Sequence, residues 1–128
     1  MKNRPFRERL GFALTGLATG WRRERSFRNQ TGMAALALLA LIVLRPAPAW
    51  WAIVAITTAL VLALELLNSA LEAVIDLLHP SIHPEVKAAK DMLAGAVLAI
   101  SIAALLVAGA MTVDTLPRRL AELGLIGA

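Results

Sequence analysis

The chain has 128 residues, of which 59% are hydrophobic and 17% charged, and its mean hydropathy is +0.70. A soluble domain of this size holds roughly half apolar and about a quarter charged residues, so the composition indicates a membrane protein. Cysteine is absent, which excludes disulfide frameworks and thiolate metal sites. The net charge of +4 could indicate binding of nucleic acid, but the placement of the charges along the chain favours contact with membrane lipid. The length predicts a single domain over residues 1–128.

The first predicted element is a helix over about residues 5–28 that lies on the membrane surface. Its apolar stripe recurs at helical spacing and consists of Leu10, Leu14, Leu17 and Trp21. Basic residues flank the stripe at both ends, where they would meet anionic lipid headgroups. The stretch does not fit a secretory signal peptide, because its apolar part is thin and runs directly into WRRERSFR.

Three membrane-spanning helices are predicted next, over residues 29–46, 49–78 and 91–113. The third contains an apolar run, Met92–Val113, of the ~20 residues that a bilayer requires. The helix breakers RPAP at 45–48 separate the first two spans. Trp50 and Trp51 follow, as expected of an interfacial aromatic belt. Residues 114–128 are predicted to be a periplasmic tail, either a short helix or without regular structure.

The basic residues predict how these spans are oriented. Segment 1–28 holds eight of them and the loop after the second span adds Lys87 and Lys90, whereas the opposite side has three. Cytoplasmic loops of membrane proteins carry the excess of lysine and arginine. The N-terminus is therefore predicted to be cytoplasmic, and its positive charge is explained by topology and lipid contact rather than by nucleic acid.

Polar side chains interrupt the second span in ELLNSALEAVID, namely Glu65, Asn68, Glu72 and Asp76. At ~100° per residue they share one helix face, within an arc of about 80°. Carboxylates in hydrocarbon cost several kcal/mol unless they are partnered or hydrated, and they usually mark function. A helix over 50–78 would be about 43 Å long, longer than the ~30 Å hydrocarbon core. The acidic face is therefore expected to run from headgroup depth into the cytoplasm, although Asp76 could equally be a solvated residue at the helix exit.

Further polar residues are predicted at the same membrane face. Glu24 stands among arginines and could form a plain ion pair, and Asp91 could cap the third span with Lys90 beside it. A histidine metal site is not expected at His79 and His83, because no third nitrogen or sulfur ligand exists. Carboxylates suit Mg²⁺ together with phosphate oxygens, and lysine suits phosphate. This inventory serves phosphoryl transfer, although no nucleotide-binding motif of the Walker or protein-kinase type is present.

The stretches ELLNSALEAVIDL (65–77), AAKDMLAGAVL (88–98) and ERSFRNQ (24–30) resemble the prokaryotic diacylglycerol kinase family of small integral-membrane lipid kinases. The resemblance covers about residues 5–112. It implies an all-α membrane protein with three transmembrane helices and one amphipathic surface helix per chain. It also implies a homotrimeric bundle in the bacterial inner membrane, with sites shared between subunits. The implied reaction is Mg²⁺-dependent transfer of phosphate from ATP to the primary hydroxyl of diacylglycerol, giving phosphatidic acid at the cytoplasmic interface.

The resemblance also implies roles for single residues of the acidic face and of the segment before the first span. Glu65 matches the general base that takes the proton of the lipid hydroxyl, and Asn68 would orient Glu65 or the γ-phosphate. Glu24 and Glu72 match the acids that hold the divalent ion on the ATP phosphates. Asp76 corresponds to a further acid without a defined role.

Nucleotide-contacting and lipid-contacting positions follow in the same way. Those matching the ATP site are Glu24, Glu72, His83, Lys90 and Asp91. Those matching the lipid site are Glu65, Arg28, Gln30 and Ala94. The chain departs from the family pattern at Gln30, where the enterobacterial form carries glutamate, and at Pro5, where an arginine of the nucleotide site would align.

Two other functions are kept as alternatives. The same family includes undecaprenol kinases, whose substrate presents its hydroxyl at the end of a prenyl chain. From another class, a non-catalytic channel or assembly protein could use the acidic face to line a pore. A pore does not require Lys90 and Asp91 beside metal-binding acids, so binding of MgATP would separate the two classes.

Overall fold

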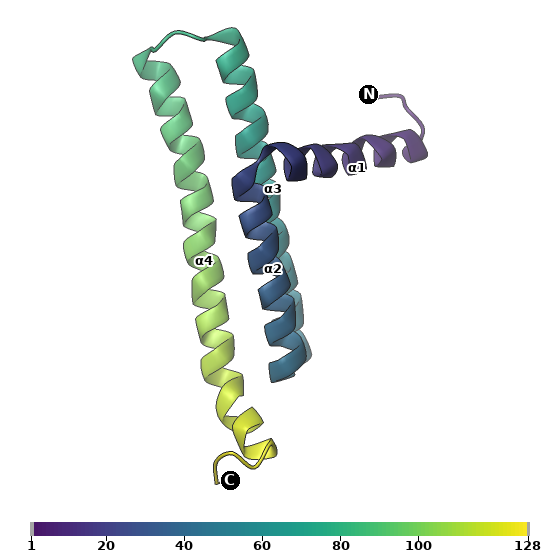
Figure 1. Ribbon diagram of the computed structural model, residues 1–128, viewed down its shortest axis with the longest axis vertical. Coiled ribbons are helices and arrows are strands. Elements are labelled where there is room, and N and C mark those ends of the chain that lie inside the picture. Colours follow the sequence, from purple (N-terminus) through teal and green to yellow (C-terminus); the bar gives the residue numbers. More distant parts are fainter. Residues whose placement is uncertain (1, 128) are drawn as a thin grey trace.

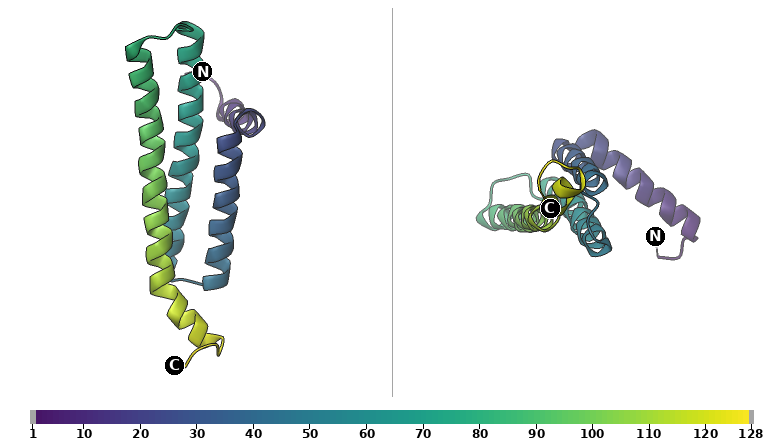
Figure 2. Two further views of the ribbon diagram at one scale, coloured as in Figure 1. Left: turned by 60° about the vertical axis from the view of Figure 1, so that its left-hand side comes forward. Right: turned by 90° about the horizontal axis from the view of Figure 1, so that it is seen from below.

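The structure, a computed structural model, describes residues 2–127 and is built from helices joined by short turns. These are α1 (Phe6–Arg23), α2 (Arg25–Leu44), α3 (Pro48–Leu78) and α4 (Pro84–Glu122). Helices α2, α3 and α4 run side by side and alternate in direction, whereas α1 projects sideways (Figures 1 and 2). Helices α2, α3 and α4 are each long and apolar enough to cross a membrane. The predictions of an all-α chain and of three such helices are confirmed, and the chain is a multi-pass membrane protein.

The break between the first two helices lies earlier than predicted, so the boundaries 5–28 and 29–46 are wrong. Glu24 has extended backbone (φ −109°, ψ 110°) and caps both the end of α1 and the start of α2. Arg28 supports this corner, because its Nη1 donates hydrogen bonds to the carbonyl oxygens of Trp21 (2.8 Å) and Arg22 (3.3 Å). These carbonyls have no partner within α1, and the arginine satisfies them.

The corner also packs closely against α3. Gly20 is buried, and a Cβ placed there would lie 2.4 Å from Leu66 Cδ2. The lack of a side chain at this position lets the end of α1 approach α3. Phe27, one turn into α2, is 5% exposed and lies near Gly20. The corner is therefore held in place by buried contacts.

Helix α4 extends beyond the predicted span 91–113 in both directions, with 39 residues. His83 caps its start, because His83 Nδ1 accepts a hydrogen bond from the backbone N–H of Glu85 at 3.2 Å, and Pro84 suits the first turn. Asp91 consequently lies inside the helix, and the alternative in which it caps the helix is wrong. The predicted tail 114–128 is helical as far as Glu122. Pro117 lies inside this end of α4, which changes direction in Figure 2.

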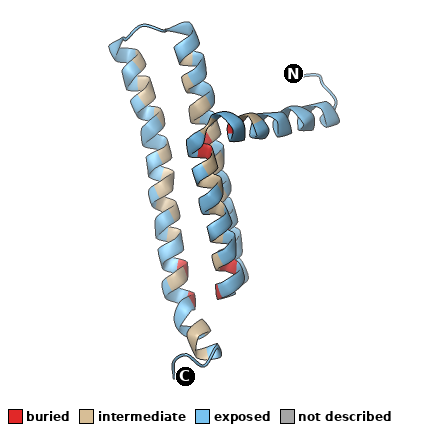
Figure 3. Cartoon of the chain, in the orientation of Figure 1, coloured by how far each residue is buried: buried red, intermediate tan, exposed pale blue. Residues whose placement is uncertain are grey.

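The apolar core lies at the end of the bundle far from α1. It consists of four side chains that are 3–8% exposed, Leu41, Leu44, Val54 and Met111. Figure 3 shows buried positions at this end and at the corner beside α1.

Hydrogen bonds tie the end of α4 to the turn between α2 and α3. Trp50 Nε1 donates to Asp114 Oδ2 at 2.8 Å, and Arg119 Nε donates to the carbonyl oxygen of Val43 at 2.9 Å. Arg118 Nη2 donates to the carbonyl oxygen of Arg45 at 3.0 Å. The two arginines thus satisfy carbonyls that the end of α2 leaves without helical partners.

We expect Arg119→Ala to destabilise the chain by about 1 kcal/mol, because the Val43 carbonyl loses its donor. The measurement is the unfolding midpoint of the protein in detergent micelles. Arg7→Ala is the control, since Arg7 is exposed and makes no ion pair or side-chain hydrogen bond within residues 2–127. Equal midpoints for Arg119→Ala and Arg7→Ala would contradict this role.

Much of the apolar surface of the long helices is uncovered in a single chain. The buried share of the spanning segments is 11% in α2, 17% in α3 and 6% in α4. A groove of about 360 Å³ between these helices is lined by apolar and uncharged polar side chains, with no carboxylate and no cation. Such surface requires lipid or further protein against it.

Candidate active site

Glu65 is the buried carboxylate of residues 2–127, with 5% of its surface exposed. It lies in the middle part of α3, about 22 Å along the helix from Trp50, which is near the far edge of a hydrocarbon core of ~30 Å. Ser26 Oγ of α2 donates a hydrogen bond to Glu65 Oε2 at 2.9 Å. Within residues 2–127 no other group donates to this carboxylate. A carboxylate that is buried at this depth with one donor is costly, which makes it the strongest candidate for chemistry.

Asn68 follows Glu65 by almost one helical turn on the same face of α3. It is half-buried, and its Oδ1 is inaccessible and accepts no hydrogen bond from the part of the chain that the structure describes. A buried acceptor without a donor costs free energy. Asn68 Oδ1, beside Glu65, is therefore a buried acceptor without a partner among residues 2–127.

The acidic face continues toward the end of α3. Glu72 is half-buried, and Asp76 is exposed and forms an ion pair with Lys90 of α4. Lys90 precedes the apolar run of α4, which begins at Met92. The hydrogen bond that Lys90 Nζ donates to Asp76 Oδ1, together with the charges of Asp76 and Glu72, raises the pKa of Lys90 against an opposing effect of burial. Lys90 is therefore protonated at neutral pH, beside the carboxylates of Asp76 and Glu72.

The predicted nucleotide residues Lys90 and Asp91 do not pair with each other. Lys90 pairs with Asp76, and Asp91 pairs with Lys87 of the preceding turn. The Lys87–Asp91 side chains are largely solvent-exposed, whereas in the other pair Asp76 is exposed and Lys90 is half-buried. Pairs so open to solvent contribute little stability. His83, also a predicted nucleotide residue, caps α4.

Glu24 lies at the corner between α1 and α2 and is half-buried. Within residues 2–127 it forms no ion pair with the arginines around it, so the plain ion pair considered from the sequence is wrong. The same residues contain no group of three or more acidic or histidine side chains that could hold a metal. Glu24 and Glu72 are carboxylates, the ligand type of which Mg²⁺ takes one or two while phosphate oxygens and water complete its shell.

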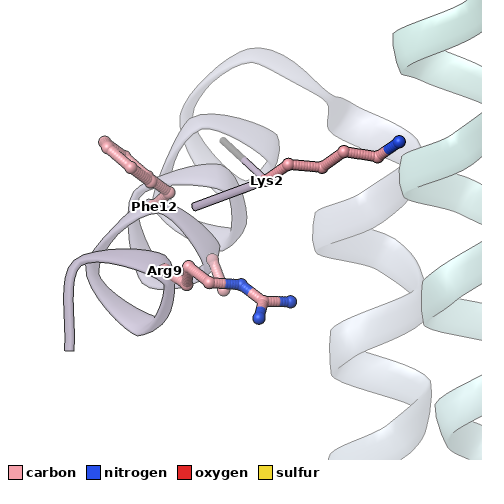
Figure 4. A pocket seen from close by; sticks show the side chains of 4 residues that line it. Lys2, Arg9 and Phe12 are labelled. Carbon is pink, nitrogen blue, oxygen red and sulfur yellow. The ribbon is translucent and has the colours of Figure 1, made fainter. Parts of the chain in front are cut away.

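The predicted lipid-contact residues are spread over three helices, with Glu65 on α3. Arg28 caps α1, Gln30 lines the groove between α2, α3 and α4, and Ala94 is exposed on α4. A separate hollow of about 460 Å³ on α1 is lined by Lys2, Arg9, Phe12 and Ala13. In Figure 4 Lys2 and Arg9 point toward the bundle, whereas Phe12 points away. The hollow contains no carboxylate and offers no base for proton transfer.

Ser26 is a site residue that the sequence analysis missed. It belongs to the motif ERSFRNQ, but nothing in the spacing distinguishes it from its neighbours. Its contact partner lies 39 residues away. The signal that could have found it is the helix break at Glu24, since a serine at the start of a helix has no carbonyl of its own helix within reach.

Comparison with known proteins places the chain in a family. Residues 11–112 match the family model described as prokaryotic diacylglycerol kinase. A diacylglycerol kinase of Synechocystis is 40% identical over 108 residues, which cover 82% of this chain and 61% of that protein. An undecaprenol kinase of Bacillus subtilis is 35% identical over 81 residues, which cover 63% of this chain and 66% of that protein. A diacylglycerol kinase of Escherichia coli K12 is 37% identical over 103 residues, which cover 75% of this chain and 79% of that protein.

The matched region contains the corner, the acidic face of α3 and the start of α4's apolar run. The chain spans less than two thirds of the length of the Synechocystis and Bacillus relatives, at 61% and 66%. The family model itself covers most of the chain, from residue 11 to residue 112. The buried Glu65, all of α2 and α3 and most of α4 lie inside this region, and the chain belongs to the prokaryotic diacylglycerol kinase family.

Proposed function

We propose that the chain is an ATP-dependent lipid kinase that phosphorylates the primary hydroxyl of diacylglycerol to give phosphatidic acid. The observation that carries the proposal is the buried Glu65 carboxylate at the edge of the apolar zone, with one oxygen held by Ser26 and the other without a donor among residues 2–127. At this depth the hydroxyl of a membrane lipid can reach a base. Glu72 and the Lys90–Asp76 pair lie further toward water, where a soluble nucleotide would enter.

The proposed reaction is an in-line displacement at the γ-phosphorus of ATP. Glu65 accepts the proton of the lipid hydroxyl as the hydroxyl oxygen forms its bond to phosphorus. The bond between the γ-phosphorus and the bridging oxygen breaks, and ADP leaves with the electron pair. Asn68, which lies almost one turn from Glu65 on the same face of α3, would orient Glu65 or the γ-phosphate.

Glu24 and Glu72 would hold the Mg²⁺ of MgATP, which neutralises charge on the phosphates. Lys90 would exchange Asp76 for a phosphate oxygen, since an ammonium binds phosphate as a point charge. Asp91 and His83 would contact the nucleotide from the start of α4. The ATP site would thus take its residues from the corner at Glu24, from α3 and from α4 with its cap.

The proposed membrane arrangement places the corner, the end of α3 and the start of α4 in the cytoplasm of a bacterial inner membrane. Helix α1 would lie on the membrane surface, because its apolar side chains Leu10, Leu14 and Trp21 are exposed in the single chain. We further propose a homotrimer with sites shared between subunits, in which Arg28, Gln30 and Ala94 line the lipid site. The uncovered apolar surface of α4 supports this, since only 6% of its spanning segment is buried.

Undecaprenol is the second candidate substrate, because the likeness to an undecaprenol kinase is nearly as high as the likeness to diacylglycerol kinases. We expect the purified protein, in mixed micelles with labelled ATP, to phosphorylate diacylglycerol at least about tenfold faster than undecaprenol at equal surface concentration, a difference of ~1.4 kcal/mol in transition-state free energy. The reverse ratio would make it an undecaprenol kinase. Turnover of neither lipid together with no binding of MgATP would favour the non-catalytic alternative.

A further inference from the structure

The hydroxyl of Ser26 differs from the other hydroxyls whose hydrogen bonds are seen in the helices. Those bond to a carbonyl four residues earlier in their own helix, as is usual for serine and threonine in helices; they belong to Thr15, Thr19, Thr31, Thr57, Ser101 and Thr112. Ser26 instead donates across to another helix, to Glu65 Oε2 at 2.9 Å.

The helix break explains this difference. The carbonyl four residues before Ser26 is that of Arg22, which lies in α1 and accepts a hydrogen bond from Arg28 Nη1. Because α2 begins at Arg25, Ser26 has no acceptor in its own helix. Its hydroxyl is therefore available for Glu65.

Neighbouring buried residues fix where this hydroxyl lies. Ser26 itself is exposed, but the next residue, Phe27, is 5% exposed, and Gly20 approaches Leu66 so closely that no side chain would fit between them without a shift. Leu66 is the neighbour of Glu65 in α3. Phe27, next to Ser26, and Leu66, next to Glu65, both pack at Gly20. This packing holds the donor and the acceptor of the hydrogen bond near each other.

The hydrogen bond has a consequence for the two oxygens of Glu65. The terminal torsion of a glutamate side chain is broad, so a carboxylate without a donor samples many orientations. Proton transfer requires the base within about 2.6–3.2 Å of the hydroxyl. A donor on Oε2 restricts the carboxylate plane and leaves Oε1 for a second partner.

We infer that Ser26 is a positioning residue for the lipid kinase reaction, holding Glu65 Oε2 so that Oε1 faces the substrate hydroxyl. The inference rests on the proposed function, because it assigns Glu65 the role of base. Ser26 need not touch the lipid or the nucleotide, and it acts through Glu65.

We expect Ser26→Ala to lower kcat about tenfold, the effect of losing one hydrogen bond to a charged group, with the KM for MgATP within about twofold of wild type. Ser26→Thr, which keeps the hydroxyl, should recover kcat to within about threefold of wild type. The control is Thr15→Ala, which removes a hydroxyl that bonds only to Gly11 of its own helix, and its kcat should equal that of wild type. A wild-type kcat in Ser26→Ala, or no recovery in Ser26→Thr, would overturn the inference.

A double-mutant comparison separates positioning from general damage to the corner. In Glu65→Asp the carboxylate is withdrawn from the hydroxyl by one methylene, so adding Ser26→Ala should change kcat by no more than about twofold. A further tenfold loss in that background would show that Ser26 acts without Glu65 and would overturn the inference.

A readout independent of turnover is the infrared difference spectrum between wild type and Ser26→Ala. It should show a shifted carboxylate band that is absent when the same pair is compared in the Glu65→Gln background. Lack of the shift would refute the inference even for a protein that is inactive on both lipids. Inactivity on both lipids with the shift present would instead refute the proposed function alone.

Discussion

Glu65→Gln is expected to lower kcat for lipid phosphorylation by about 10²–10⁴-fold, the usual contribution of a general base. Glutamine keeps the size of the side chain and can still accept the hydrogen bond of Ser26, which donates to Glu65 Oε2 at 2.9 Å, but it cannot accept the substrate proton. Because the change acts on the lipid hydroxyl, the affinity for MgATP should stay within about twofold. The measurements are steady-state turnover with labelled ATP and direct binding of MgATP to the same preparation.

The control for Glu65→Gln is Glu122→Gln. Glu122 lies at the opposite end of the bundle, where its ion pairs with Arg118 and Arg119 are partly exposed and contribute little. Its turnover should equal that of wild type. Loss of MgATP binding equal to the loss of turnover in Glu65→Gln would contradict a role confined to the hydroxyl, and would place Glu65 in the nucleotide site instead.

Glu72→Gln is expected to raise the Mg²⁺ concentration needed for half-maximal turnover by at least about tenfold. Removal of a group that supports a metal commonly costs 10–100-fold in affinity, and Mg²⁺ takes few protein ligands beside phosphate and water. Glu72 is half-buried, whereas Asp76, one turn further along, is exposed and pairs with Lys90. The measurement is a Mg²⁺ titration of turnover at fixed, saturating ATP.

Glu24→Gln provides a second arm of this experiment, because Glu24 would share the ion although it lies on the corner and not on α3. Its titration should move in the same direction as that of Glu72→Gln, whereas Glu122→Gln should leave the titration unchanged. A normal titration in Glu72→Gln would remove this residue from the proposed ligands, and a normal titration in Glu24→Gln would do the same for Glu24.

The sequence alone predicts the number and type of the long helices well, because length and hydropathy decide whether a segment can span a bilayer. The helix predicted over 49–78 agrees with α3, Pro48–Leu78, to within one residue at its start. Proline suits a first turn and cannot continue a helix further along, so the prolines on either side make these boundaries readable from the chain.

The boundaries that were wrong depend on side chains that cap a helix from a distance. The end of α1 at Arg23 depends on Arg28, which caps α1, and on Gly20, which meets Leu66 of α3. The end of α4 is similar, since Arg119 reaches the carbonyl of Val43, 76 residues away. Local propensity contains no information about such contacts.

Part of the candidate site could likewise be predicted from the sequence, and part of it could not. Spacing along a helix determines that Glu65, Asn68 and Glu72 share a face, since 3.6 residues make one turn wherever the helix lies. Which of the acids is buried, and what each one contacts, was decided by the tertiary structure alone: Glu65 lies against Ser26, and Asp76 pairs with Lys90. These contacts join different helices, and their distances depend on how the helices cross and on where a residue without a side chain, such as Gly20, permits a close approach.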